Sequence, residues 1–130
     1  MVDMYHDLLA KIKNAVRARK DVVRVPFSNM DFAVLKLLMQ ERYVKDVRKK
    51  TFEKKHVIEI ELERNDAGRY AIKDFKLVSK PSRRIYMSYR VLRPVRQGYG
   101  LGVLSTPEGV LSVKEARKRK VGGEYLFEIW

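Results

Sequence analysis

Two adjacent hydroxyl-bearing residues, Ser105 and Thr106, are the side chains of this sequence with the clearest potential for chemistry. They lie in VLSTPEGVLS, where an apolar run stops at the hydroxyls and resumes after Pro107, Glu108 and a glycine. A serine acts as a nucleophile only when a base lies within hydrogen-bonding distance. The chain has two histidines, and neither stands in a catalytic sequence context. A serine–lysine pair stays compatible with the spacing, but the missing base argues against an enzyme.

The same stretch is well suited to be a binding loop. Hydroxyls beside exposed backbone amides can hydrogen-bond RNA base edges, 2′-hydroxyls and phosphates, and a proline fixes the loop shape at low entropic cost. Tyr86 has two open roles: it can stack on an unpaired base, or it can be an ordinary residue of an amphipathic strand.

No metal or cofactor is expected. The chain has no cysteine, and its histidines and carboxylates are scattered, so no cluster with metal-ligand spacing is visible. The glycines of GYGLGVL lack the Gly-Lys-Ser/Thr ending of a phosphate-binding loop. Their alternation instead favours a strand in which the backbone is closely approached or bent.

Charge indicates the kind of partner. The chain carries 29 Lys and Arg against 16 Asp and Glu, a net charge of +13, which favours a polyanion and above all nucleic acid. Residues 1–79 hold 18 basic and 12 acidic side chains, whereas 80–130 hold 11 and 4. Two alternatives stay open: an RNA-modifying or RNA-cleaving enzyme using the same basic surface, and a protein–protein adaptor whose charge is incidental.

The elements of the first half follow from its periodicity. Apolar residues at helical spacing predict a helix from Met4 to Val16, with Asp3 as its N-cap. VVRVPFS predicts a short strand that stops at Pro26. Ser28 and Asp31 predict the cap of a second helix ending near Tyr43. HVIEIELE predicts a half-buried strand, with RNDAGR as a turn and YAIKDFKLV as the returning strand.

That strand places three glutamates on one face: Glu59, Glu61 and Glu63. Three carboxylates in a row would repel a phosphate backbone, so we expect this face to point away from nucleic acid.

In the second half, Ser112 and Glu115 predict another capping box, followed by a short basic helix that Gly122 and Gly123 terminate and by a final strand. Composition shifts at SKPSRR, where we place a boundary. We therefore expect an α+β protein of two small lobes: an αβαββ-type lobe over 1–79 and an RNA-binding lobe over 80–130 that is mainly β with one short helix. Without a signal peptide or membrane span, a cytoplasmic protein is expected.

Long segments resemble one family. STPEGV followed by EARKRKVGGEYLFEIW is similar to the C-terminal signature of small-subunit ribosomal protein eight, and HDLLAKIKNA, VPFSNMDFAVLKLLMQERYVKDV and VSKPSRRIYMSY resemble its other segments in the same order. The short middle of the chain resembles archaeal members of this universal family. The third loop position, commonly serine in the family, is Pro107 here.

The resemblance implies a structural constituent of the small ribosomal subunit. It implies a primary binder of small-subunit ribosomal RNA that docks on an irregular helix of the central domain, promotes assembly, and stays a monomer beside neighbouring small-subunit ribosomal proteins. It also implies RNA contacts at Ser105, Thr106, Pro107, Tyr86, Gly123, Glu124, Asn29, Met30 and Lys55.

Two carboxylates near this loop need a physical role, since a carboxylate beside phosphates is unfavourable unless it accepts hydrogen bonds. Glu124 is expected to brace the Ser-Thr loop or to accept from a base amino group, with a solvent-facing strand residue as the plain alternative. Glu108 is expected to point outward or to meet a base donor or a cation.

Overall fold

The computed structural model describes residues 4–95 and 99–130, and its chain divides into two compact units, Asp3–Lys73 and Asp74–Trp130. Both units combine helices with an antiparallel sheet, which confirms the predicted α+β class. The compositional shift at residues 79–84 falls inside the second unit, after its first strand. In the part of the chain that the structure describes, no helix has the length and apolar character needed to cross a membrane.

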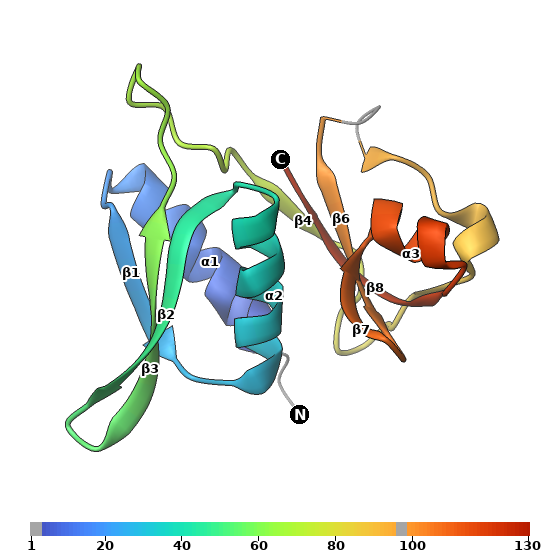
Figure 1. Cartoon of the computed structure of the whole chain (residues 1–130), viewed down its shortest axis with the longest axis horizontal. Helices are drawn as coiled ribbons and strands as arrows, with labels where there is room; N and C mark the ends of the chain where they lie inside the picture. The colour runs from blue at the N-terminus through green and yellow to red at the C-terminus, as the bar shows by residue number, and fades with distance from the viewer. Residues whose placement is uncertain (1–3, 96–98) are drawn as a thin grey trace. The chain divides into compact units, whose positions relative to one another are not determined.

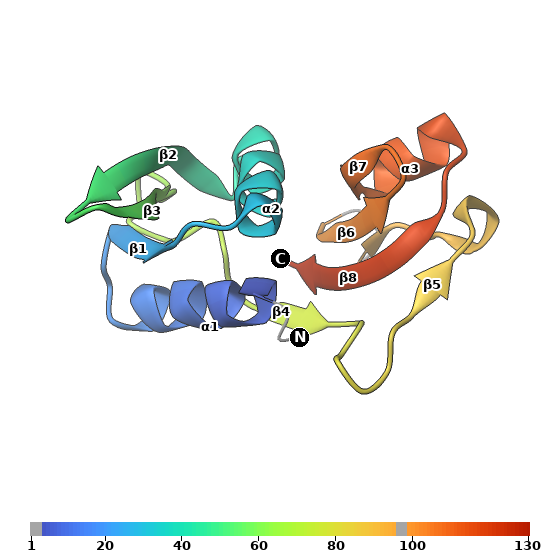
Figure 2. The same cartoon turned by 90° about the horizontal axis from the view of Figure 1, so that it is seen from below.

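The first unit has the expected αβαββ order (Figure 1). It consists of α1 (Met4–Arg17), β1 (Val22–Pro26), α2 (Asn29–Gln40), β2 (Val44–Phe52) and β3 (Lys55–Leu62). The sheet is antiparallel, with β3 between β1 and β2. Both helices cover one face of this sheet (Figure 2), and the fully buried residues include Leu8 and Ile12 of α1, Leu38 of α2 and Ile58 and Ile60 of β3.

Local chemistry sets the helix ends in this unit. The Ser28 hydroxyl accepts a hydrogen bond from the Asp31 amide at 3.0 Å, as the capping pattern predicts. The helix ends at Gln40, three residues earlier than expected. Arg42 then adopts a left-handed φ of 63°, and β2 begins at Val44. The predicted N-cap Asp3 lies outside the described residues.

One strand pairing predicted from the sequence is wrong. β3 pairs with β1 and β2 rather than with residues 70–78. The RNDAGR turn does form, because Asn65 Oδ1 accepts from the Ala67 and Arg69 amides. The returning chain forms an isolated bridge between Arg64 and Tyr70, and the Ala71 amide donates to the Glu63 carbonyl at 2.9 Å. Phe75–Leu77 instead pairs with the last strand of the second unit.

The second unit is built on a sheet in the order β4-β8-β6-β7, with β5 also paired to β8. Its elements are β4 (Phe75–Leu77), β5 (Tyr86–Met87), the 3-10 helix η1 (Tyr89–Val91), β6 (Leu101–Thr106), β7 (Gly109–Ser112), α3 (Val113–Arg119) and β8 (Gly123–Ile129). One core cluster packs Leu92, Leu104, Leu111, Val113, Ala116 and Tyr125 together.

The short basic helix α3 begins as expected but ends differently. The Ser112 hydroxyl accepts from the Glu115 amide at 3.1 Å. The predicted stop at Gly122 and Gly123 is wrong, because Lys120 provides the left-handed cap with a φ of 57°. The two glycines serve a different purpose at the interface described below.

Candidate nucleic-acid interface

Three of the predicted contact residues lie in one row across three strands. Glu124 of β8 pairs directly with Tyr86 of β5 on one side and with Ser105 of β6 on the other. Directly paired residues of antiparallel strands present their side chains on the same face of a sheet. A phenol, a carboxylate and a hydroxyl therefore stand side by side, although 38 residues of sequence separate Tyr86 from Glu124.

Thr106 fixes the shape of the loop. Its hydroxyl donates to the Gly109 carbonyl at 2.8 Å and accepts from the Glu108 amide at 3.1 Å, so both ends of the β6–β7 hairpin turn are tied to one side chain. Pro107 presets the backbone at the first turn position, and Gly109 takes a φ of +109°, which favours glycine. The hydroxyl of Thr106 thus holds the turn.

Unlike the Thr106 hydroxyl, the hydroxyls of Ser105 and Tyr86 are available to bind a ligand. Within the described residues, neither side chain makes a hydrogen bond. Tyr86 is 71% exposed, an unusual degree for a tyrosine on a strand. Ser105 is half-buried at the end of β6. These two groups can each donate or accept a hydrogen bond, and the Tyr86 ring offers a face for stacking.

Glu124 has a partner that the sequence did not reveal. Arg84 Nη1 donates to Glu124 Oε2 at 3.1 Å. The carboxylate is only 15% exposed and the guanidinium 35% exposed. Because opposite charges attract, Arg84 partly neutralises the Glu124 carboxylate. The sequence signal that could have identified this partner is a cation two residues before Tyr86 on the same segment.

Two glycines let the strands of this site approach one another. A Cβ on Gly123 would overlap the carbonyl oxygen of Ser105, and a Cβ on Gly122 would overlap that of Met87. Only glycine allows this close backbone packing. Gly123 therefore acts on the site through backbone position, by holding the end of β6 against β8.

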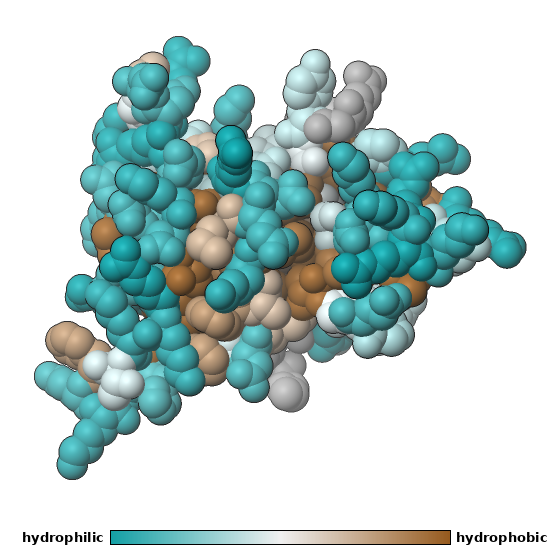
Figure 3. All heavy atoms as spheres, in the orientation of Figure 1, coloured by the Kyte–Doolittle hydropathy of each residue, from teal (hydrophilic) through white to brown (hydrophobic). Residues whose placement is uncertain are grey.

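Glu108, at the tip of the hairpin, meets a cation as expected. Arg119 Nη1 of α3 lies 3.6 Å from Glu108 Oε1, and Arg119 Nε donates to Glu115 Oε1 at 2.8 Å. Hydrophilic side chains gather over α3 in Figure 3, where Lys114, Arg117, Lys118 and Arg119 are found. The hairpin tip is thus bordered by basic side chains.

The three weaker candidates all lie in the first unit. Asn29 and Met30 are the first two residues of α2, with Asn29 exposed and Met30 half-buried, and Lys55 is the exposed first residue of β3. The Phe27 amide donates to the His56 carbonyl at 3.1 Å, which brings the start of α2 to the start of β3. The structure therefore groups these candidates at one end of the unit.

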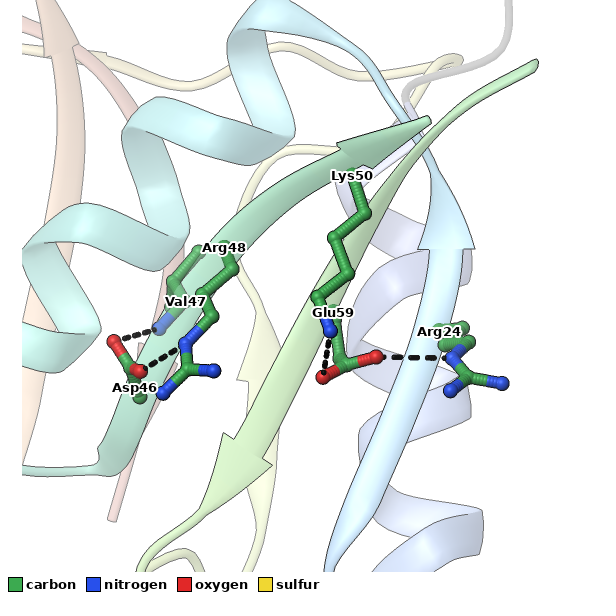
Figure 4. Close-up of polar contacts among 6 residues, drawn as sticks. All are labelled: Arg24, Asp46, Val47, Arg48, Lys50 and Glu59. Atoms are coloured by element: carbon green, nitrogen blue, oxygen red, sulfur yellow. Dashed lines mark hydrogen bonds and ion pairs between the residues drawn. The ribbon is translucent and has the colours of Figure 1, made fainter. Parts of the chain in front are cut away.

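The glutamate row of β3 is not a bare acidic face (Figure 4). Glu59 accepts hydrogen bonds from Lys50 of β2 at 3.0 Å and from Arg24 of β1 at 3.1 Å, and these donors hold its pKa below the usual range. Glu61 lies 3.5 Å from Lys45. The flanking strands thus place cations beside two of the three carboxylates. That this face points away from nucleic acid stays a prediction.

Within the described residues, no group of three or more His, Cys, Asp or Glu side chains has the geometry to hold a metal ion.

Comparison with known proteins shows the family of this chain. The family model described as ribosomal protein S8 matches residues 3–130. Proteins named small ribosomal subunit protein uS8 from Streptococcus pneumoniae serotype 19F and from the Hungary19A-6 strain of that species are each 38% identical over 130 residues, covering 100% of this chain and 98% of the relative. The chain belongs to the ribosomal protein S8 family.

Proposed function

We propose that this protein is a structural constituent of the small ribosomal subunit that binds small-subunit ribosomal RNA directly. Its relatives carry the name of a small-subunit protein, and its net charge of +13 suits a polyanionic partner. Neighbouring small-subunit ribosomal proteins and a cytoplasmic ribosome belong to the same proposal.

The finer part of the proposal is that the RNA is an irregular helix of the central domain, and that binding it promotes subunit assembly. The observation that supports it is the Tyr86–Glu124–Ser105 row. An unpaired base can stack on the Tyr86 ring while its edge or its 2′-hydroxyl bonds to Ser105. A regular A-form duplex offers no such splayed base, so this row favours irregular RNA.

Basic side chains around the row supply affinity that does not depend on sequence. The exposed side chains in this part of the second unit include Lys80, Arg83, Arg84, Arg90 and Arg93. Phosphate contacts set register and orientation, whereas base contacts discriminate. Affinity is therefore spread over many cations, and selectivity rests on few residues.

The proposal is tested by comparing variants on two RNAs of equal length, an irregular central-domain helix and a regular duplex. Tyr86→Ala removes the stacking surface, and Arg93→Gln is a matched control that removes one surface charge from the same unit. We expect Tyr86→Ala to weaken binding to the irregular helix by about tenfold or more, given 1–3 kcal/mol per stacked base, with little change on the duplex. Equal losses on both RNAs would defeat the assignment of the site.

A further inference from the structure

Ser79 is a buried polar residue of the second unit that lies outside every contact proposed so far. Its side chain is 0% exposed, and it stands two residues after Leu77, the last residue of β4. A hydroxyl enclosed in the interior needs hydrogen-bond partners, because an unpaired polar group there is costly. The groups that it bonds to therefore indicate what it does.

The Ser79 hydroxyl bridges two backbone groups. It donates to the Tyr125 carbonyl at 2.7 Å and accepts from the Ile85 amide at 2.9 Å. The Ile85 carbonyl, at 3.4 Å, is a longer and weaker alternative acceptor. Since a hydroxyl has one proton and two lone pairs, it can make the two short bonds at the same time.

This bridge stands where a bond of the strand ladder would otherwise form. The Tyr125 amide donates to the Ile85 carbonyl at 2.8 Å. In a regular antiparallel sheet, two residues paired in this way exchange both of their N–H···O bonds, so the Ile85 amide would donate back to the Tyr125 carbonyl. The Ser79 hydroxyl instead bonds to both of these groups. The second bond of the pair therefore runs through a side chain.

Ser79 also fills the interval between two short strands that pair with β8. β4 pairs with the last three residues of β8, and β5 pairs with its first two. Between them, the amides of Val78 and Ser79 both donate to the Leu126 carbonyl, at 3.1 and 3.2 Å. Ser79 therefore holds β8 twice, through its amide at Leu126 and through its hydroxyl at Tyr125.

The chain makes a tight excursion between Ser79 and β5. Lys80 and Arg83 exchange two backbone hydrogen bonds, each of 2.9 Å, across a two-residue turn. Figure 2 shows this segment as a loop that leaves the sheet after β4 and returns at β5. The turn sets the direction of the returning chain. The Ser79 hydroxyl, by holding the Ile85 amide, sets where that chain meets β8.

The position of Tyr86 depends on this attachment, because β5 is only two residues long and has few ladder bonds of its own. The bridge holds Ile85, directly before Tyr86, and Tyr125, directly after Glu124. Arg84, which forms the ion pair with Glu124, lies on the other side of Ile85. The bridge thus joins the chain neighbours of two members of the row.

We propose that Ser79 is a positioning residue for the Tyr86–Glu124–Ser105 row, a role that rests on the RNA-binding function proposed above. Its own side chain is enclosed and does not contact RNA. Its hydroxyl fixes where β5 meets β8, and so sets the register at which Tyr86 stands beside Glu124. Alanine at this position leaves a buried backbone donor and a buried backbone acceptor without their partner, so the end of β5 should loosen.

Two NMR measurements on the full-length wild-type protein test the bridge itself. The Ile85 amide should exchange slowly with solvent, although Ile85 lies outside any strand. Because hydrogen-bonded and non-hydrogen-bonded pairs alternate along a ladder, Tyr86 and Glu124 form a pair whose α-carbons lie about 4.5 Å apart. We therefore expect a strong NOE between their Hα protons. An Ile85 amide that exchanges as fast as in an unfolded chain would overturn the proposal.

Two variants separate positioning from stability. Ser79→Ala and the matched control Ser112→Ala each remove a buried hydroxyl of the second unit, but the Ser112 hydroxyl accepts from the Glu115 amide and caps α3. We expect Ser79→Ala to speed exchange of the Ile85 amide by about tenfold or more and to weaken the NOE between Tyr86 and Glu124. Ser112→Ala should leave that NOE unchanged, and a dispersed amide spectrum shows that each variant is folded.

RNA binding then tests what the position serves. The ratio of affinity for the irregular helix to affinity for the regular duplex should fall about three- to tenfold in Ser79→Ala, because the stacking surface is displaced. In Ser112→Ala it should stay within about twofold of the wild type, as for a distant site. Equal losses in both variants would overturn the proposal, since they would reflect stability alone.

Failure of the positioning role and failure of the proposed RNA site give different results. An NOE between Tyr86 and Glu124 that is unchanged in Ser79→Ala would overturn the role of Ser79, whatever the RNA affinities are. A weakened NOE with an unchanged affinity ratio would support the attachment of β5 by Ser79 and show that the row does not select RNA.

Discussion

Ser105 and Glu124 face each other directly across β6 and β8, and Tyr86 occupies the next position of the same row. Two interstrand spacings of about 4.8 Å set the length of this row at about 10 Å. The Ser105 hydroxyl, the Glu124 carboxylate and the Tyr86 ring are thus held on paired strands, so their spacing is set by the sheet and not by a loop.

The two hydroxyls of the loop should respond differently to substitution. Ser105→Ala removes a free hydroxyl, so we expect RNA binding to weaken by about fivefold, the worth of one hydrogen bond, with unchanged stability. Thr106→Val removes both turn hydrogen bonds and should lower the unfolding free energy by about 1 kcal/mol or more as well as binding. Thr106→Ser should retain both. Denaturant unfolding and RNA binding are measured on all three variants. If Ser105→Ala and Thr106→Val change stability and affinity to the same extent, Ser105 is not a contact residue and Thr106 is not a positioning residue as assigned here.

Arg84 should affect RNA affinity through its ion pair with Glu124. Arg84→Gln leaves the carboxylate without its cation, so we expect weaker RNA binding, because an unpaired negative charge then faces the phosphates. Adding Glu124→Gln to Arg84→Gln should restore part of the loss. A double-mutant cycle on RNA affinity measures this coupling, and strictly additive effects would show that the pair does not act together.

Gly123→Ala should damage the site through the backbone. Its Cβ would overlap the Ser105 carbonyl oxygen, so the two strands must separate, at a cost of about 1–3 kcal/mol typical of overpacking. Thermal unfolding measures the loss. Gly68→Ala is the control: its Cβ would meet nothing within 4 Å, although its φ of +77° still carries strain. A Gly123→Ala protein as stable as the wild type would refute the close-packing role.

Asp31 should make stability depend on pH. Burial raises the pKa of this carboxyl from 3.8 to about 6, and its side chain is 2% exposed. The folded state therefore binds a proton more tightly than the unfolded state, so this group lowers stability as pH rises from about 4 to 6. Asp31→Asn cannot ionise, and its stability relative to the wild type should increase over that range by about 2–3 kcal/mol.

Chemical denaturation of both proteins at pH 4, 5, 6 and 7 provides the comparison. A difference in unfolding free energy that stays constant with pH would show that Asp31 titrates normally.

Periodicity and capping were reliable guides where one face of an element is buried. The alternation of Ile58, Ile60 and Leu62 with glutamates located β3, and Ser28 and Ser112 both cap helices as their spacing indicates. The strand β2 was not predicted, because too few of its residues are buried to give a clear alternation of apolar and polar side chains. Only Val44 and Val47 are buried, a register shift lies between Val44 and Asp46, and the rest is charged or exposed.

Pairing between distant segments could not be read from local pattern. The apolar residues of YAIKDFKLV indicated a strand, but nothing in the stretch shows that its partner is Phe127–Ile129 at the end of the chain. The candidate site could be predicted only in part from the sequence. Motifs identified Ser105, Tyr86 and Glu124, but their alignment in one row depends on the sheet register, which the sequence does not show. The ion pair between Arg84 and Glu124 depends on it too.

The most direct measurement is a salt series of wild-type binding to an irregular central-domain helix and to a regular duplex of equal length. Cation–phosphate contacts weaken with salt on both RNAs, whereas stacking and hydrogen bonding at the row should preserve a margin for the irregular helix. We expect that margin to survive as salt rises. If both RNAs bind alike and lose affinity together, the basic surface binds RNA but the Tyr86–Glu124–Ser105 row does not select it.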